Sequence, residues 1–329
     1  MVKNALRRRL PLVAVGIAVV LWSTSFGISS EVLKTASPAA LSVGRFAIGL
    51  IVLVPLAARR PLFVRTLRDP RTILLGLLGV AIYYSLTNVG LEFTTPGTAA
   101  LSNAALPALT ALLGLFILKE RLAPRTIVGL VLATAGVVIV AGAGLTLDIG
   151  VLLCLIGLTS YALYTVLLRK GVPAEPQQWA AVGRRATGAV DPLVLATATA
   201  MWGTAIMLPW LVAEMAAGAA AIPSGWGGLG GLLVLGVVIT APTLVLFNYG
   251  AERLPAAATG ALTAAIPALG YLFALLLGEP FDAITALGGA VALVGVAIAS
   301  VTVPSTDSSP AGSGLPSHED VAAGPSARD

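Results

Sequence analysis

The sequence has almost none of the residues from which disulfides, metal sites and histidine-based catalysts are built. It contains one cysteine, Cys154, and one histidine, His318, among 329 residues. A disulfide framework needs paired cysteines, and zinc or iron–sulfur sites need several ligands at short spacings. The sequence also lacks a nucleotide-binding P-loop. We therefore expect no metal ion and no cofactor, and the composition argues against an enzyme.

The sequence is also poor in charged residues. Only 11% of the residues are Asp, Glu, Lys or Arg, while 57% are hydrophobic and the mean hydropathy is +0.95. An ordinary soluble domain carries roughly 25% charged residues. The composition excludes a soluble globular protein and makes the lipid bilayer its expected surroundings. The net charge of +5 is concentrated in loops, so we expect no nucleic-acid partner.

Long apolar runs predict an all-α integral membrane protein with ten transmembrane helices. Each run is close to the length of about 20 residues that crosses the hydrocarbon core. The first run follows basic residues, so a cleaved signal peptide is the alternative there; its length and the lack of an A-x-A-like site favour a retained helix. The predicted helices are 11–30, 38–58, 72–91, 95–118, 125–143, 148–168, 191–213, 226–248, 255–277 and 281–303.

The distribution of basic residues predicts the orientation of these helices. With a cytoplasmic N-terminus, 18 of the 20 lysines and arginines fall on the cytoplasmic side, and Lys34 and Arg45 are the exceptions. Such an asymmetry is the positive-inside rule, and it places both termini in the cytoplasm. Residues 1–10 are then a basic cytoplasmic N-terminus and 169–190 a cytoplasmic loop. Residues 304–329, rich in Ser, Pro and Gly, are predicted to be a disordered cytoplasmic tail.

The chain contains an internal repeat. Segments 11–143 and 148–303 each hold five predicted helices, and residues match between them at an offset of 160 and, after one deletion, 159. Because five is odd, the second segment crosses the membrane upside down relative to the first. Inverted repeats of this kind are typical of secondary transporters. Matched polar and special residues include Asn88 with Asn248, Glu92 with Glu252, and Pro107 with Pro267.

A matched pair of prolines predicts kinks in two of the helices. Pro107 and Pro267 lie near the middle of the fourth and ninth helices, where proline removes a backbone hydrogen bond. We expect kinks there that take part in gating, and packing alone is the alternative.

The fifth and tenth helices carry small residues at matched four-residue steps. Gly129 with Ala133 and Gly288 with Ala292 are of the kind that lets helix backbones approach closely. Packing within the chain is the expected use of this seam, and a dimer seam is the alternative. The expected state is accordingly a monomer or a homodimer.

Together these features resemble the EamA-type branch of the drug/metabolite transporter superfamily, from about Val13 to Val303. The resemblance is carried by LWSTSFGISS in the first helix, PAALSVGRFAIG in the second, LPALTALLGLFILKERL in the fourth, SYALYTVLLRK in the sixth and IPALGYLFALLLGEP in the ninth. It implies a carrier of ten helices in two inverted repeats, commonly an exporter of amino acids or other small metabolites in bacterial inner membranes. The loop after Lys170 and the polar tail depart from the usual pattern.

Polar residues inside the spans are the candidate substrate-binding residues, because they are costly in hydrocarbon unless they face a cavity or a partner. Arg45 is the only charged residue well inside a predicted span. Its guanidinium is suited to binding a substrate carboxylate with two hydrogen bonds. Snorkelling towards the membrane surface, or bonding to helix carbonyls, is the equal alternative.

Asparagine and aromatic residues complete the candidate site. Three asparagines offer amide groups, with capping of the local backbone as the alternative: Asn88, Asn103 and Asn248. Rings with polar ends suit an amphipathic cavity, although some are expected to be interfacial anchors or core residues. The aromatic candidates are Trp22, Tyr83, Tyr84, Tyr161, Tyr164, Trp202 and Tyr271.

Energy coupling has few candidate residues. Proton relays use Asp, Glu or His at depth, and here Glu92 and Glu252 lie near helix ends. Proton antiport through these two and uncoupled exchange or facilitated diffusion both remain open. The sequence thus predicts a secondary transporter of small metabolites, foremost an exporter of amino acids or related compounds, that works by alternating access at a midplane site. A multidrug or organic-cation exporter and a non-transporting membrane scaffold or sensor are the alternatives.

Overall fold

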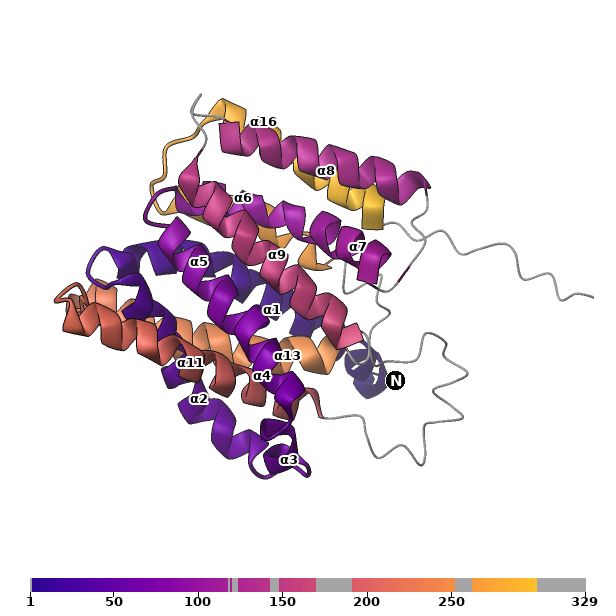
Figure 1. The fold of residues 1–329 in the computed structure, drawn as a ribbon. Coiled ribbons are helices and arrows are strands. Elements are labelled where there is room, and N and C mark those ends of the chain that lie inside the picture. Colours follow the sequence, from indigo (N-terminus) through magenta and orange to yellow (C-terminus); the bar gives the residue numbers. More distant parts are fainter. Residues whose placement is uncertain are drawn as a thin grey trace, which may run out of the picture.

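The computed structural model (Figure 1) describes residues 2–117, 119, 124–142, 148–169, 191–251 and 262–300. Within these ranges every regular element is a helix, and there is no strand. The predicted tail 304–329, nearly all of the predicted loop 169–190, and Glu252 lie outside the described residues.

The first half of the chain forms four long helical runs and several short segments. The bounds are α1 (Val2–Leu33), α2 (Pro38–Ala57), α3 (Phe63–Leu67), α4 (Pro70–Gly76), the π-helical η1 (Leu77–Ile82), α5 (Tyr83–Gly90), α6 (Pro96–Ser102), the 3-10 segment η2 (Asn103–Ala105), α7 (Leu106–Ile117) and α8 (Pro124–Gly142). Helix α1 begins earlier than the predicted 11–30, so the basic N-terminal residues are helical. A proline inside its first turns, Pro11, does not end the helix.

The second half also contains long helices and helices interrupted by π-helical stretches. Its bounds are α9 (Ile149–Arg169), α11 (Pro192–Ala216), the π-helical η3 (Trp226–Gly230), α12 (Gly231–Leu233), the π-helical η4 (Val234–Thr240), α13 (Ala241–Ala251), α15 (Ile266–Leu276) and α16 (Ala283–Ser300).

Several helices begin with the same N-terminal capping arrangement. Ser37 precedes α2, and its side chain accepts a hydrogen bond from the Ala40 N–H while Pro38 occupies the first helical turn. Asp69, Thr95 and Asp191 cap α4, α6 and α11 in the same way, each followed by a proline. A capping oxygen satisfies a free N–H, and proline lacks the N–H that would otherwise be unpaired. These starts therefore follow from the local sequence.

Seven helical runs among the described residues are long and apolar enough to cross a membrane. They correspond to the predicted spans 11–30, 38–58, 72–91, 95–118, 148–168, 191–213 and 226–248. The remaining predictions coincide with shorter apolar helices, Ile127–Val140, Ile266–Leu276 and Ala283–Ala299. The all-helical, membrane-spanning character is confirmed, and the count of ten stays a prediction.

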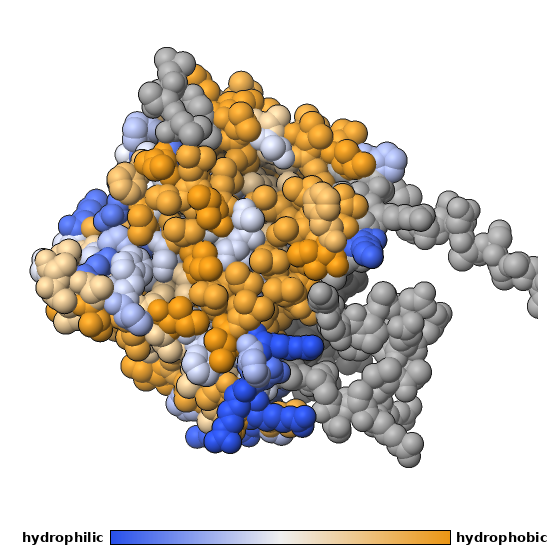
Figure 2. Space-filling view, in the orientation of Figure 1, coloured by the Kyte–Doolittle hydropathy of each residue, from blue (hydrophilic) through white to orange (hydrophobic). Residues whose placement is uncertain are grey.

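The surface matches a chain that is surrounded by lipid. Figure 2 shows a largely apolar face, with hydrophilic side chains gathered over α3. Soluble monomers rarely expose an apolar surface of this extent, whereas proteins that lie in a bilayer do. The exposed arginines around α3 are Arg59, Arg60, Arg65, Arg68 and Arg71.

The helices divide into a central group and an outer pair. Helix α2 packs on α11, α1 packs on α13 and α15, and α5 packs on α9. Helices α8 and α16 lie side by side along one edge (Figure 1). A Cβ atom built on Gly129 would lie 2.6 Å from the Gly295 carbonyl oxygen, and one built on Gly288 would lie 2.9 Å from that of Gly136. The small-residue seam is therefore used within the chain.

Candidate functional site

Arg45 lies in the interior of the helix group, where α2 faces η4. The residue is 2% exposed, and its Nε and Nη2 groups donate to the Thr240 hydroxyl over 3.4 and 3.3 Å. The same hydroxyl donates its proton to the Leu235 carbonyl at 2.7 Å. Among the described residues, the salt bridges join other pairs and none involves Arg45. Within the described part of the chain, its charge thus has a neutral hydrogen-bond partner and no salt bridge to a carboxylate.

Aromatic rings cover the other side of the guanidinium. Its central carbon lies 4.8 Å from the centre of the Tyr84 ring and 5.8 Å from that of Phe46. A cation over a ring face is attracted by the ring's quadrupole, by about 0.5–2 kcal/mol depending on desolvation. Full neutralisation of a buried charge requires more than this. The site therefore retains a positive character that favours an anion.

A row of tyrosines continues from this cation. The ring centres of Tyr83 and Tyr84 are 4.7 Å apart, those of Tyr83 and Tyr161 are 5.0 Å apart, and those of Tyr161 and Tyr164 are 5.3 Å apart. Tyr83 and Tyr84 come from α5, whereas the other two come from α9. Four of the aromatic residues singled out in the sequence thus form one row, and Tyr84 at its end contacts Arg45.

The asparagines occupy different settings. Asn88 is 2% exposed and donates to the Ser42 hydroxyl at 2.8 Å, which ties α5 to α2. Asn103 accepts from the Tyr83 hydroxyl at 3.4 Å and donates to the Ala99 carbonyl at 3.0 Å. Asn103 therefore joins the tyrosine row, while Asn88 holds two helices together. The side chain of Asn248 lies outside the described residues.

Three aromatic candidates lie apart from the tyrosine row. Trp202 donates its ring N–H to the Leu67 carbonyl at 2.8 Å, beside the basic loop. Trp22 packs on Phe247 with ring centres 5.0 Å apart. Tyr271 contacts the Asp282 carbonyl at 3.4 Å, in an exposed setting between α15 and α16.

The matched prolines each follow an interruption of a helix. The 3-10 segment η2 separates α6 from α7, and Pro107 is the second residue of α7. Pro267 is likewise the second residue of α15, directly after a turn at 264–265. The regular α-helical pattern is therefore interrupted directly before each proline.

Glu92 is the described member of the predicted proton-coupling pair. It is exposed in the turn after α5. Partial burial raises the pKa of its carboxyl group, and the charge of Glu214 raises it further.

Sequence reasoning missed Thr240, Phe46 and Ser42. Each contacts a predicted residue, yet none is charged or matched in the repeat. The available signal was weak: Thr240 is one of two hydroxyl residues in the predicted span 226–248. Only tertiary contact distinguishes it from Thr243, whose hydroxyl bonds back to the Ile239 carbonyl of its own helix.

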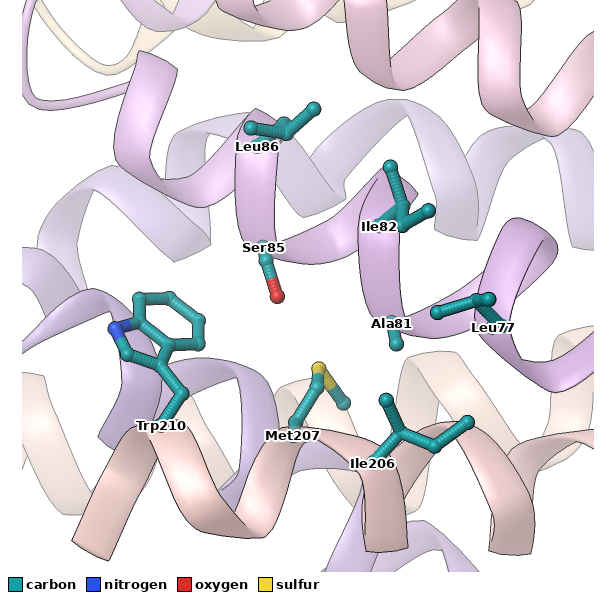
Figure 3. Close-up of a pocket in the computed structure, with 8 residues that line it drawn as sticks. All are labelled: Leu77, Ala81, Ile82, Ser85, Leu86, Ile206, Met207 and Trp210. Carbon is teal, nitrogen blue, oxygen red and sulfur yellow. The ribbon is translucent and has the colours of Figure 1, made fainter. Parts of the chain in front are cut away.

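A separate hollow opens between η1–α5 and α11 (Figure 3). It has a volume of about 330 Å³. Its lining is apolar except for the Ser85 hydroxyl and the Trp210 ring N–H. The lining residues are Leu77, Ala81, Ile82, Ser85, Leu86, Ile206, Met207 and Trp210. Among the described residues, no three His, Cys, Asp or Glu side chains are grouped as metal ligands.

Comparison with known families finds one family model that matches two parts of the chain. The model of the EamA-like transporter family matches residues 10–142 and again residues 148–301. The chain belongs to the EamA-like transporter family. As an EamA-like protein it is an integral membrane protein of the lipid bilayer that carries small molecules, and its relatives are transporters rather than enzymes.

Two curated relatives align with this chain over most of their length. An uncharacterized transporter of Archaeoglobus fulgidus is 22% identical over 87% of this chain and 97% of its own. A probable terminal-alkyne amino-acid exporter of Streptantibioticus cattleyicolor is 29% identical over 86% of this chain and 91% of its own. One crystal structure shares the fold, with a TM-score of 0.61 and 22% identity over 88% of this chain and 95% of that one.

Proposed function

We propose that this EamA-like protein is a secondary transporter that exports amino acids or related small carboxylates, with Arg45 as the carboxylate-binding residue. The observation that carries the proposal is the buried guanidinium of Arg45, which contacts a threonine hydroxyl and aromatic rings but no acidic side chain among the described residues. A substrate carboxylate supplies the missing negative charge through two charge-assisted hydrogen bonds. The similarity to a probable amino-acid exporter supports the same substrate class.

The tyrosine row binds the remainder of the substrate in this proposal. Tyr83, Tyr84 and Tyr161 present apolar ring faces together with hydroxyl groups. Asn103 adds an amide next to the Tyr83 hydroxyl. Such a mixture of rings and a few directed polar groups is typical of sites for small amphipathic molecules.

The proposed architecture is ten transmembrane helices in two inverted repeats, with both termini in the cytoplasm of a bacterial cell and the protein in its inner membrane. Reciprocal contacts support it. At the repeat offset of 159, Gly129 corresponds to Gly288 and Gly136 to Gly295, so the Gly129–Gly295 contact becomes the Gly288–Gly136 contact. The packing of α1 on α13 likewise corresponds to that of α9 on α5.

Alternating access then uses the two interrupted helices. The breaks before Pro107 and Pro267 lie at corresponding places in the two segments. Discontinuous helices at matched positions are the usual location of transporter binding sites and gates. We propose that the helix parts on either side of each break move relative to one another as the site opens to one face or the other.

Counterflow in proteoliposomes tests the proposal. Vesicles containing the purified full chain are preloaded with unlabelled amino acids, sugars or drug-like cations, and uptake of the labelled compound is followed. We expect saturable exchange of amino acids that is lost in Arg45→Gln and partly kept in Arg45→Lys. The Pro107→Ala, Pro267→Ala double variant should also lose exchange.

Three results contradict the proposal. Exchange of cations alone indicates an organic-cation exporter, and exchange by folded Arg45→Gln at the wild-type rate removes Arg45 from substrate binding. No exchange of any compound by folded protein favours a non-transporting scaffold or sensor. Size-exclusion profiles and melting temperatures establish that each variant is folded.

A further inference from the structure

The connection between α2 and α4 carries more positive charge than its acidic neighbours balance. Residues 58–71 contain five exposed arginines and one acidic residue, Asp69. Arg60 pairs with Asp191 at 3.6 Å, and the other four arginines form no salt bridge among the described residues. Asp69 accepts a hydrogen bond from the backbone N–H of Arg71 at 2.9 Å. The hydrophilic patch over α3 (Figure 2) is therefore complementary to an anion.

This basic segment lies at a membrane surface and is held against α11. It connects two helical runs that are long enough to cross a bilayer, Pro38–Ala57 and Pro70–Gly90. The Trp202 ring N–H donates to the Leu67 carbonyl at 2.8 Å, which fixes α3 on α11. Val64 of α3 is exposed beside the arginines. Apolar and basic side chains on one surface segment suit contact with acyl chains and anionic headgroups together.

The hollow of Figure 3 begins close to this segment. Trp202, Ile206 and Trp210 follow one another at four-residue steps, so they share one face of α11. The first of them bonds to α3, and the other two line the hollow. On the opposite side, Arg71 is six residues before Leu77, with which the lining of the hollow begins. The hollow therefore runs from near the basic segment between η1–α5 and α11 (Figure 3).

The chemistry of the hollow suits a hydrocarbon chain. Its volume is about 330 Å³, and its lining is apolar except for one hydroxyl and one ring N–H. Exposed leucines lie beside it on both sides, Leu74 on α4 and Leu208 on α11. Because exposed apolar residues of a membrane-spanning helix face lipid, a chain from the bilayer has direct access to this space.

We propose that the hollow and the basic segment together bind one anionic phospholipid of the surrounding bilayer. The phosphate lies at Arg68 and Arg71, where guanidinium groups supply charge-assisted hydrogen bonds. One acyl chain lies in the hollow, where burial of apolar surface stabilises it. The phospholipid binds without Arg45 and is not the transported solute, so the site goes beyond the proposed transport function.

Tryptophan quenching by brominated phospholipids tests the proposal. The full chain is reconstituted in phosphatidylcholine vesicles that contain increasing fractions of brominated phosphatidylglycerol or, for comparison, brominated phosphatidylcholine. Trp210 lines the hollow, so the quenching that is absent in Trp210→Phe reports a chain bound there. We expect this component to saturate at a several-fold lower fraction of the anionic lipid than of phosphatidylcholine.

Variants separate the contributions of the arginines and the hollow. Arg68→Gln, Arg71→Gln should weaken binding of phosphatidylglycerol about tenfold or more, because each basic residue near an anionic surface changes binding several-fold. Arg68→Lys, Arg71→Lys should keep most of the binding, since the charge remains. Lys34→Gln is the control, because it removes an exposed cation that pairs with Glu31 elsewhere on the surface. Ser85→Leu should exclude the chain by filling the hollow.

Four results overturn the proposal. Equal affinity for the two lipids does so with the wild-type chain alone, whether or not any variant folds. Wild-type affinity in the folded Arg68→Gln, Arg71→Gln variant removes the arginines from the site, and unchanged quenching in folded Ser85→Leu removes the chain from the hollow. Loss of the preference in millimolar inorganic phosphate assigns the arginines to free phosphate.

A final variant separates this site from the proposed transport. Arg45→Gln should retain the preference for phosphatidylglycerol even where amino-acid exchange is lost, because Arg45 contacts Thr240 and lies in neither the hollow nor the basic segment. Loss of the preference in folded Arg45→Gln would contradict a separate lipid site. Melting temperatures and size-exclusion profiles establish that each variant is folded.

Discussion

The two segments matched by the family model, 10–142 and 148–301, share a scaffold but differ in their chemistry. Each carries a π-helical stretch in its third predicted span, η1 in the first and η4 in the second. Each also packs a glycine of that span on the other segment: Gly76 lies against Gly203, and Gly236 lies against Gly49. In the proposed repeat, Gly76 and Gly236 correspond at the offset of 160, which makes Gly49 and Gly203 counterparts as well.

The difference appears four residues before these glycines. Arg45 precedes Gly49, whereas Thr199 precedes Gly203. Arg45 reaches across to Thr240, while the Thr199 hydroxyl donates to the Ala196 carbonyl of its own helix at 2.9 Å. The two segments therefore share close glycine packing, whereas only the first places a buried cation at this position.

Making the two segments alike at this position should have the largest effect. Arg45→Thr should lower the rate of amino-acid counterflow about 10- to 100-fold, because hydrogen bonds to charged groups contribute about 1.5–3 kcal/mol. The folded yield should not fall, since the variant removes a buried charge that lacks a carboxylate. Thr199→Val is the control, and a comparable loss there would mean that both positions act through packing.

The small-residue seam should respond equally in both segments. Gly136→Ala and Gly288→Ala place a methyl group against the facing backbone, and overpacking costs about 1–3 kcal/mol. Thermal unfolding in detergent should show lower melting temperatures for both variants. Gly16→Ala in α1 meets nothing within 4 Å and serves as the control. A large difference in melting temperature between the two seam variants would contradict the equivalence of the two segments.

Thr240 belongs to the second segment, and its hydroxyl accepts a hydrogen bond from Arg45 of the first. Thr240→Val keeps the shape but removes the hydroxyl that accepts from Arg45 at 3.3 Å. We expect an intermediate loss, about 3- to 10-fold in counterflow, because a typical hydrogen bond contributes about 1 kcal/mol. Thr243→Val removes a hydroxyl bonded within its own helix, and an equal loss there would indicate a general effect on helix α13.

Weakening the hydrogen bond between Glu279 and Gly97, which joins the two segments, should have the smallest effect. Glu279 accepts from the Gly97 backbone N–H at 2.8 Å, at the start of α6. Glu279→Gln keeps an acceptor but removes the charge near the helix start, a change of about 0.3–1 kcal/mol. The melting temperature should fall by only a few degrees. No change relative to the exposed-site control Glu31→Gln would show that the contact contributes nothing.

Much of the fold was predictable because it depends on local sequence. Apolar runs predicted the long helices, and Ser37–Pro38 and Asp191–Pro192 mark helix starts through capping. The small residues predicted the seam between α8 and α16. The predicted start of the first helix was less accurate, because hydropathy detects the apolar part of α1 whereas the helix itself begins at Val2.

The candidate site was predictable only in part. The cost of burying a charge singled out Arg45, and the tyrosines followed from their amphipathic rings. Sequence did not separate Tyr83 and Tyr161, which pack together, from Trp202, which bonds to the Leu67 carbonyl. All three are aromatic residues within apolar runs, so hydropathy does not distinguish their roles.

The sequence by itself determined the membrane environment, the long apolar helices and the family, because these depend on composition, run length and order along the chain. The tertiary structure decided what Arg45 contacts, since its hydroxyl partner Thr240 is 195 residues away. It also decided that η1–α5 and α11 leave a hollow of about 330 Å³ between them. Contacts of this kind depend on which helix faces meet, and in lipid that choice is made by side-chain packing and hydrogen bonds between distant segments rather than by hydrophobicity.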